Sequence, residues 1–124
     1  MQIPKKYIVD YAVAIECIYQ ATKSLAINPE AVSLINKSIL VLKEKNYWKN
    51  FIDIHDLENI TNQIQNGKTK FDFDIIELLK LTAKKLLSNC FYIGYHLSNL
   101  EDINSDTTLA IHRIGNLSEY FSIH

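Results

Sequence analysis

Apolar residues recur at steps of three and four along most of the chain, which is the spacing of one face of an α-helix. Between Lys5 and Ile27 the apolar and polar positions separate onto two opposite faces. The expected core residues of this segment are Tyr7, Ile8, Tyr11, Ile15, Ile18, Thr22 and Leu25. Its expected solvent-facing residues are Lys6, Asp10, Glu16, Gln20, Lys23 and Ser24. The pattern therefore predicts an amphipathic helix.

A second helix is predicted to start at Asn28, Pro29 and Glu30. Asparagine accepts hydrogen bonds from unpaired amides, proline suits the first helical position, and a carboxylate is favoured by the helix dipole. The helix is expected to end near Lys45 and Asn46. Its apolar stripe comprises Val32, Ile35, Ile39 and Leu42, with Leu34 and Val41 beside it.

The segment from Tyr47 to Gln65 has a weaker pattern, with a narrow stripe of Leu57, Ile60 and Ile64. We interpret it as one helix, either straight or bent near His55. It is expected to stop at Asn66 and Gly67, because glycine readily adopts the left-handed conformation that ends a helix.

The clearest periodicity runs from about Asp74 to Leu97, and a last helix is predicted to start at Asn104, Ser105 and Asp106. The expected core of the former is Ile75, Leu79, Leu86, Cys90, Ile93 and Leu97. The expected core of the latter is Leu109, Ile114, Leu117 and Phe121. Gly94 costs about 1 kcal/mol in a helix interior relative to alanine. Close approach of another helix or a frayed helix end would account for it.

Helices of this kind joined by short connections predict an all-α fold, a compact bundle of about five amphipathic helices whose neighbours alternate up and down. The composition agrees, because 3 glycines and 2 prolines in 124 residues are too few for a turn-rich β fold. Apolar residues make up 48% and charged residues 22%, which is ordinary for globular proteins. We therefore expect residues 1–124 to form a single helical domain.

No segment reaches the roughly 18 uninterrupted apolar residues of a membrane span. Asp10 and Glu16 interrupt the first apolar run, and no cleavage site of a signal peptide follows it. We therefore expect a cytoplasmic protein that does not bind a membrane. In that compartment Cys17 and Cys90 are expected to be buried free thiols, with a disulfide as the alternative.

Catalytic and metal-binding motifs are weak. The histidines are His55, His96, His112 and His124, and no two of them have the helical spacing that would aim both at one metal. Asp53, His55 and Asp56 are metal-ligand types, but adjacent helical positions point apart. The sequence also lacks phosphate-binding glycine loops and nucleophile motifs. We expect no enzyme, no metal and no cofactor.

Nucleic-acid binding is not expected either, because it needs a concentrated positive face. The lysines are scattered among acids, and Arg113 is the single arginine. Lys80, Lys84 and Lys85 form the densest basic patch and are interpreted as a solvated helix face.

The acidic residues are unevenly distributed. Residues 50–124 carry five lysines and one arginine against ten acids, a balance of −4, although the whole chain carries only −1. The acids form three groups near predicted helix starts: Asp53, Asp56 and Glu58; Asp72, Asp74 and Glu77; Glu101, Asp102 and Asp106. They are interpreted either as charges that favour helix starts or as an acidic surface for a basic partner.

Two hypotheses of function follow. The first is a small intracellular protein-binding inhibitor, such as an immunity protein or antitoxin, that covers the active surface of a basic toxin. The expected aromatic anchors Trp48, Tyr92 and Tyr95 fall partly off the predicted apolar stripes, and the expected binding acids are Asp53, Asp56, Glu58, Asp72 and Asp74. The second is a small helical enzyme whose site assembles from His96, Glu101, Asp102 and His112. A helical regulatory subunit is a further alternative.

Overall fold

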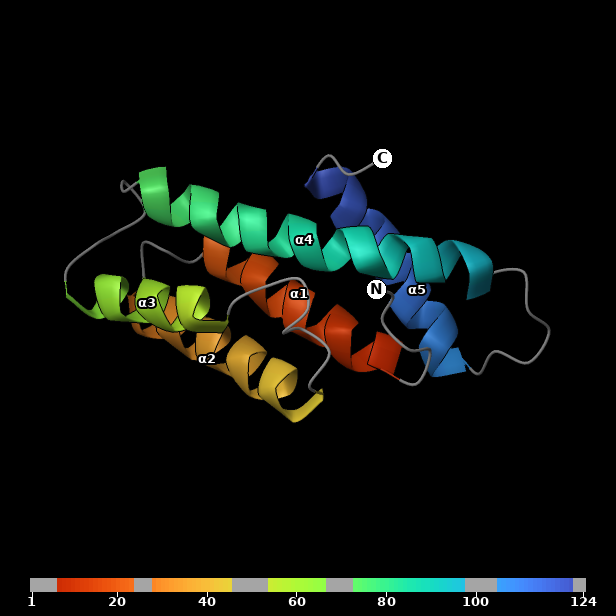
Figure 1. Cartoon of the computed structure of the whole chain (residues 1–124), viewed down its shortest axis with the longest axis horizontal. Helices are drawn as coiled ribbons and strands as arrows, with labels where there is room; N and C mark the ends of the chain where they lie inside the picture. Colours follow the sequence, from red (N-terminus) through yellow and green to blue (C-terminus); the bar gives the residue numbers. More distant parts are fainter. Residues whose placement is uncertain (1–6, 24–27, 46–53, 67–72, 98–104, 122–124) are drawn as a thin grey trace.

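The computed structural model describes residues 7–23, 28–45, 54–66, 73–97 and 105–121, and the statements below concern these residues. For residues 28, 45, 73, 74, 89–97 and 105 it describes the backbone alone. The described residues form five helices and no strand (Figure 1). The helices are α1 (Ile8–Lys23), α2 (Asn28–Lys45), α3 (Ile54–Gln65), α4 (Phe73–Leu97) and α5 (Ser105–Tyr120). The predicted all-α bundle is confirmed.

The helix boundaries follow the sequence signals closely. α2 begins at Asn28, where the asparagine, proline and glutamate signal is found, and α5 begins at Ser105. α3 begins at Ile54, and the predicted helical stretch from residue 47 to 53, on the N-terminal side of the bend considered near His55, lies outside the described residues.

α1 occupies the centre of the bundle. It packs against α2, α4 and α5, and Figure 1 shows it lying between α2 on one side and α5 on the other. Its buried face is broad, because Ala12, Ala14, Cys17 and Ala21 are buried as well as the predicted Tyr11 and Ile15. Small side chains at these positions leave room for several helices to approach α1 closely.

Successive helices reverse direction along the long axis of the bundle, as the up-and-down expectation requires (Figure 1). The helices nevertheless do not pack only against their neighbours in sequence, because α5 contacts α1 as well as α4. α5 crosses α4 steeply (Figure 1). α1 therefore contacts helices from both the N-terminal and the C-terminal half of the sequence.

All five helices contribute to one hydrophobic core. Most of the predicted core residues with described side chains are buried: Ile8, Tyr11, Ile15, Ile18, Val32, Ile35, Ile39, Leu42, Leu57, Ile60, Ile64, Ile75, Leu79, Leu86, Ile114, Leu117 and Phe121. The other predicted core positions of α4 lie where the structure describes only the backbone. Thr22 is only half-buried, and its hydroxyl donates to the Tyr19 carbonyl at 2.6 Å.

Leu109 is the clear error among the predicted core residues, because it is 67% exposed. The buried stripe of α5 instead passes through Thr107, Ala110 and Ile114. Leu109 lies one residue, or about 100°, away from Ala110 around the helix. The alanine faces α5's neighbours, and the leucine faces outward.

Cys17 is a buried free thiol, as expected, whereas the side chain of Cys90 is not among those described. Lys84 and Lys85 are exposed and Lys80 is half-buried, which fits a solvated helix face. Within the described ranges, no helix combines the length and the apolar character that crossing a membrane demands.

Candidate functional site

A surface groove runs between α2 and α3. One part is a hollow of about 790 Å³ lined by Pro29, Val32, Ser33, Asn36, Lys37, Leu40, Ile64 and Gln65. A second hollow of about 370 Å³ is lined by Asn36, Ile39, Leu40, Lys43, Glu58, Thr61 and Asn62. The two hollows adjoin, because Asn36 and Leu40 line both. We call their combined lining the α2–α3 groove.

Leu40 is the most prominent apolar residue of the α2–α3 groove. The side chains of Ile39 and Leu42 enter the core, whereas Leu40 lies on the other face of α2 and is 69% exposed. A large apolar side chain beside a surface hollow is a typical anchor for a protein partner. The sequence pattern did not single it out, because it lies one position outside the predicted stripe.

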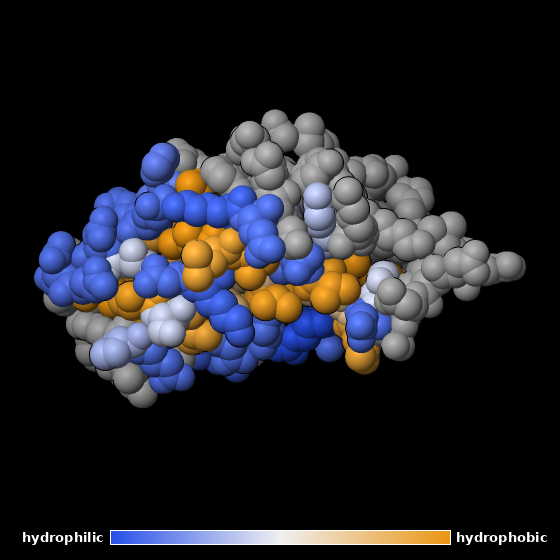
Figure 2. All heavy atoms as spheres, turned by 90° about the horizontal axis from the view of Figure 1, so that it is seen from below, coloured by the Kyte–Doolittle hydropathy of each residue, from blue (hydrophilic) through white to orange (hydrophobic). Residues whose placement is uncertain are grey.

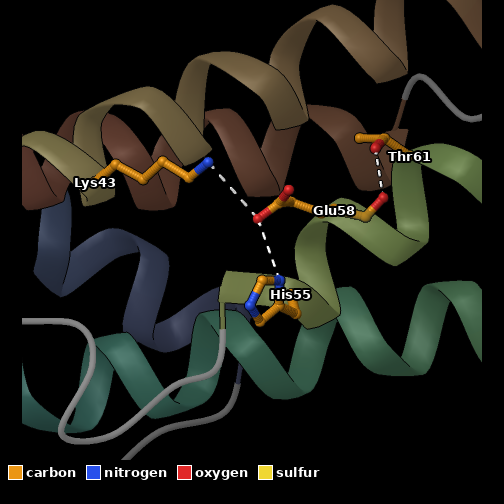
Figure 3. A network of polar contacts seen from close by, with 4 residues as sticks. All are labelled: Lys43, His55, Glu58 and Thr61. Carbon is orange, nitrogen blue, oxygen red and sulfur yellow. Dashed lines mark hydrogen bonds and ion pairs between the residues drawn. The ribbon is translucent and has the colours of Figure 1, made fainter.

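The far end of the α2–α3 groove holds a polar network centred on Glu58 (Figure 3). Its Oε1 lies 3.7 Å from Lys43 Nζ on α2 and 3.5 Å from Nδ1 of His55 on α3. The Thr61 hydroxyl donates to the Glu58 carbonyl at 2.7 Å. Because the Lys43, His55 and Glu58 side chains are all substantially exposed, these contacts contribute only about 0–1 kcal/mol to stability. Lys43 nonetheless offsets the negative charge of Glu58 locally.

Asp56 is the acid of this region that has no ion-pair partner among the described residues. It lies in the first turn of α3 and is exposed. The helix dipole favours a carboxylate at this position, but an exposed carboxylate also remains available to a basic partner.

The other residues of the predicted binding surface are not resolved into a site. Asp53, Asp72 and Trp48 lie outside the described residues. Asp74, Tyr92 and Tyr95 belong to α4, where only their backbone is described. Of the predicted set, the structure describes the side chains of Asp56 and Glu58, both on α3: Glu58 lines the α2–α3 groove, whereas Asp56 is exposed and is not among the residues that line it.

The residues of the enzyme hypothesis are also only partly described. His112 is exposed on α5, the backbone of His96 lies in α4, and Glu101 and Asp102 are outside the described residues. No cluster of three or more histidine, cysteine, aspartate or glutamate side chains suited to a metal occurs in the described part of the chain. The enzyme hypothesis stays a prediction.

A second surface, missed by the sequence patterns, lies on α1 and α5. A hollow of about 400 Å³ is lined by Val9, Ala12, Val13, Glu16, Cys17, Lys37, Asp106, Leu109, Ala110 and Arg113. Val9, Val13 and Leu109 are exposed. In the view from below, hydrophobic atoms lie in a band between hydrophilic ones, and the band also runs across the side of α2 and α3 (Figure 2). We call the lining of this hollow the α1–α5 face.

Charged and titratable groups border the α1–α5 face. The guanidinium of Arg113 forms an ion pair with Glu16, and this contact raises the pKa of Arg113. Gln20 Nε2 donates to the other carboxylate oxygen of Glu16 at 2.9 Å. Burial raises the pKa of the Cys17 thiol, while the positive charge of Lys37 acts in the opposite direction. The thiol is therefore held in its neutral form.

An aromatic cluster joins α1 to the end of α5. The Tyr19 ring meets the Tyr120 ring edge-on, with centroids 4.4 Å apart, and the Phe121 ring at 6.3 Å. Lys23 Nζ lies 4.5 Å and the Arg113 guanidinium carbon 5.8 Å from the Tyr19 centroid. A hydrogen bond with Tyr19 raises the pKa of Lys23. These contacts fix the end of α5 against α1.

Comparisons of the chain with protein-family models, with curated proteins and with solved structures find no match. The fold and the surface therefore define the class of the protein. It is an all-α bundle that exposes a groove between α2 and α3 and an apolar face on α1 and α5.

Proposed function

We propose that this protein is a small protein-binding inhibitor, of the immunity-protein or antitoxin type, which covers the active surface of a basic toxin. The observation that carries the proposal is the exposed Leu40, which lines both hollows of the α2–α3 groove, together with the exposed carboxylate of Asp56 in the first turn of α3. Tight protein interfaces combine such a centre with a charged rim.

The apolar part of the contact supplies affinity. A side chain of the partner would enter the 790 Å³ hollow and pack against Leu40 and Val32. Amide groups of Asn36, Asn62 and Gln65 line the groove and would hydrogen-bond to the partner's backbone. A few such desolvated contacts account for most of the binding energy in typical interfaces.

The acidic part supplies association rate. Asp56 is exposed at the start of α3, and the sequence adds Asp53, Asp72 and Asp74 to the same C-terminal excess of acids. Long-range attraction between an acidic surface and a basic partner raises the association rate and depends strongly on salt. Trp48, Tyr92 and Tyr95 are proposed as further aromatic anchors.

The proposal is tested by affinity capture from cells of the protein's own source, with wild type, Leu40→Asp and Leu81→Asp as baits. Leu81 is an exposed leucine on α4, 48% exposed, that does not line the groove, so Leu81→Asp is a matched control. We expect wild type and Leu81→Asp to capture one basic protein and Leu40→Asp to lose it. The captured protein's own activity should then be blocked at a one-to-one ratio by wild type.

Equal capture by the Leu40→Asp bait would show that the α2–α3 groove is not the binding site. A captured partner that stays fully active when saturated with wild type would show that the protein is not an inhibitor. Circular dichroism of each bait confirms that the substituted chains remain helical.

A further inference from the structure

The α1–α5 face combines a protruding apolar group with a depression. Leu109 is 67% exposed on α5, and Val9 and Val13 are exposed on α1. The hollow beside them is also lined by Ala12, Cys17 and Ala110, which are small and buried. Large side chains at the rim and small ones at the floor form a hole for one large apolar side chain.

This shape is complementary to itself. In a two-fold symmetric contact the same patch is used by both subunits, so each knob must find its hole on the same surface. Leu109 of one copy can enter the hollow floored by Ala12 and Ala110 of the other, and the symmetry repeats the contact. Val9 and Val13 then lie at the centre, where an interface is most apolar.

The charges of the α1–α5 face are also complementary to themselves. Lys37 comes from α2 and Asp106 from α5, helices that lie on opposite sides of α1 (Figure 1). Both side chains are exposed, and neither forms an ion pair within the described ranges. Glu16 and Arg113 already neutralise each other. A strongly basic or strongly acidic partner would leave one of the two free charges mismatched.

We infer that the α1–α5 face binds a second copy of this chain in a two-fold symmetric dimer. Leu109 of each copy fills the hollow of the other, and Lys37 of each copy pairs with Asp106 of the other. The α2–α3 groove adjoins this face at Lys37, which lines both hollows. The inference does not rest on the proposed inhibitor function.

The first test is sedimentation equilibrium of the full chain over a range of concentrations. Wild type is expected to dimerise reversibly, Leu109→Asp to remain monomeric, and the matched control Leu81→Asp to dimerise like wild type. Urea unfolding of each monomer checks that Leu109→Asp still folds. A monomeric wild type at millimolar concentration, or a Leu109→Asp chain that dimerises like wild type, would overturn the inference.

The second test exchanges the charges of Lys37 and Asp106. A nonspecific apolar contact would not respond to this exchange in the way expected of the two-fold contact. Lys37→Asp alone and Asp106→Lys alone each place like charges together twice, and each is expected to weaken dimerisation about tenfold, or about 1.4 kcal/mol. When the two variants are mixed, each contact again joins unlike charges, so a heterodimer of near wild-type affinity is expected. The double variant Lys37→Asp/Asp106→Lys should recover in the same way.

The heterodimer is detected by placing an affinity tag on one of the two variants. Failure of the mixture to associate more tightly than either variant alone would exclude the two-fold arrangement. Asp106 lies in the first turn of α5, so Asp106→Lys also loses a favourable helix-dipole interaction. The monomer stability of that variant is measured separately, which distinguishes a weakened helix from a weakened interface.

Discussion

The guanidinium of Arg113 on α5 is paired with the carboxylate of Glu16 on α1, across the contact between the first and the last helix. The sequence pattern places Glu16 in solvent, but in the structure it is half-buried and is held on its other oxygen by Gln20. The pair thus connects two helices that are distant in sequence.

The first prediction concerns this pair. Arg113→Met leaves a partly buried carboxylate without its cation and removes the guanidinium from the Tyr19 ring, and should lower the free energy of unfolding by about 1–3 kcal/mol. Glu16→Gln should cost less, because the more exposed guanidinium regains water. Urea unfolding measures both, and a double-mutant cycle isolates the interaction. A Glu16→Gln chain less stable than Arg113→Met would contradict this asymmetry.

The second prediction concerns Cys17, whose pKa is raised by burial. The folded chain keeps the thiol proton to a higher pH than the unfolded chain does. Below the pKa of the unfolded thiol, about 8.5, both states carry the proton and the stability contributed by the buried neutral thiol is fully present. As the pH rises above that value, the unfolded chain loses its proton first, so this contribution to the free energy of unfolding is lost. In a Cys90→Ala background, stability should therefore fall more steeply above pH 8.5 with Cys17 present than with Cys17→Ala.

The same burial should slow alkylation of Cys17, because the thiolate is the reactive form. We expect iodoacetamide to modify Cys17 at pH 8 far more slowly in the folded chain than in urea, again in the Cys90→Ala background. Equal rates in the two states would mean that the thiol is neither buried nor held neutral.

The third prediction compares two leucines of α4 that are two residues apart. Leu79 is fully buried and Leu81 is 48% exposed. Leu79→Ala should destabilise the fold by about 2–5 kcal/mol, because it leaves a cavity in the core. Leu81→Ala should change stability by less than about 0.5 kcal/mol. Thermal or urea unfolding measures both losses of stability. Similar losses for both variants would mean that α4 is rotated about its own axis relative to the structure described.

The fourth prediction concerns the charged residues Asp56 and Lys43 near the start of α3 and presupposes a captured basic partner. Asp56→Lys should slow association and reduce its salt dependence, with little change in dissociation. Lys43→Ala should speed association and increase its salt dependence, because it removes the cation 3.7 Å from Glu58. Stopped-flow association at two salt concentrations measures both effects.

Glu119→Lys, at an exposed position on α5, is the matched charge-reversal control and should change the association rate less than Asp56→Lys does. If Asp56→Lys folds and binds at the wild-type rate, Asp56 serves only the start of α3. Asp56→Asn separates loss of charge from reversal of charge.

The predicted apolar stripes of α2 and α3 agree with the structure, because these helices bury one face each. Ile35, Ile39, Leu57 and Ile60 could be assigned from spacing alone, since the spacing of a helical face depends only on the helix itself. α1 was less completely predicted, because three neighbouring helices cover most of its circumference. Ala12 and Ala21 are therefore buried without belonging to a narrow stripe.

The candidate site was predictable only where it lies on one helix. Asp56 and Glu58 are close in sequence and near a helix start, so both were identified as candidate binding residues. The pairing of Glu58 with Lys43 was not predictable, because it depends on how α3 approaches α2. Leu40 was missed for the same reason, since the groove beside it exists only between two packed helices.

The sequence by itself determined the fold class and most helix boundaries, because helical periodicity, caps and helix-stopping residues are local properties of the chain. Only the tertiary structure decided which face of each helix meets another helix. Leu109 is exposed and Ala110 is buried because α5 turns the alanine, not the leucine, toward its neighbours. The apolar character of a residue favours burial, but the rotation and neighbours of its helix determine whether burial occurs.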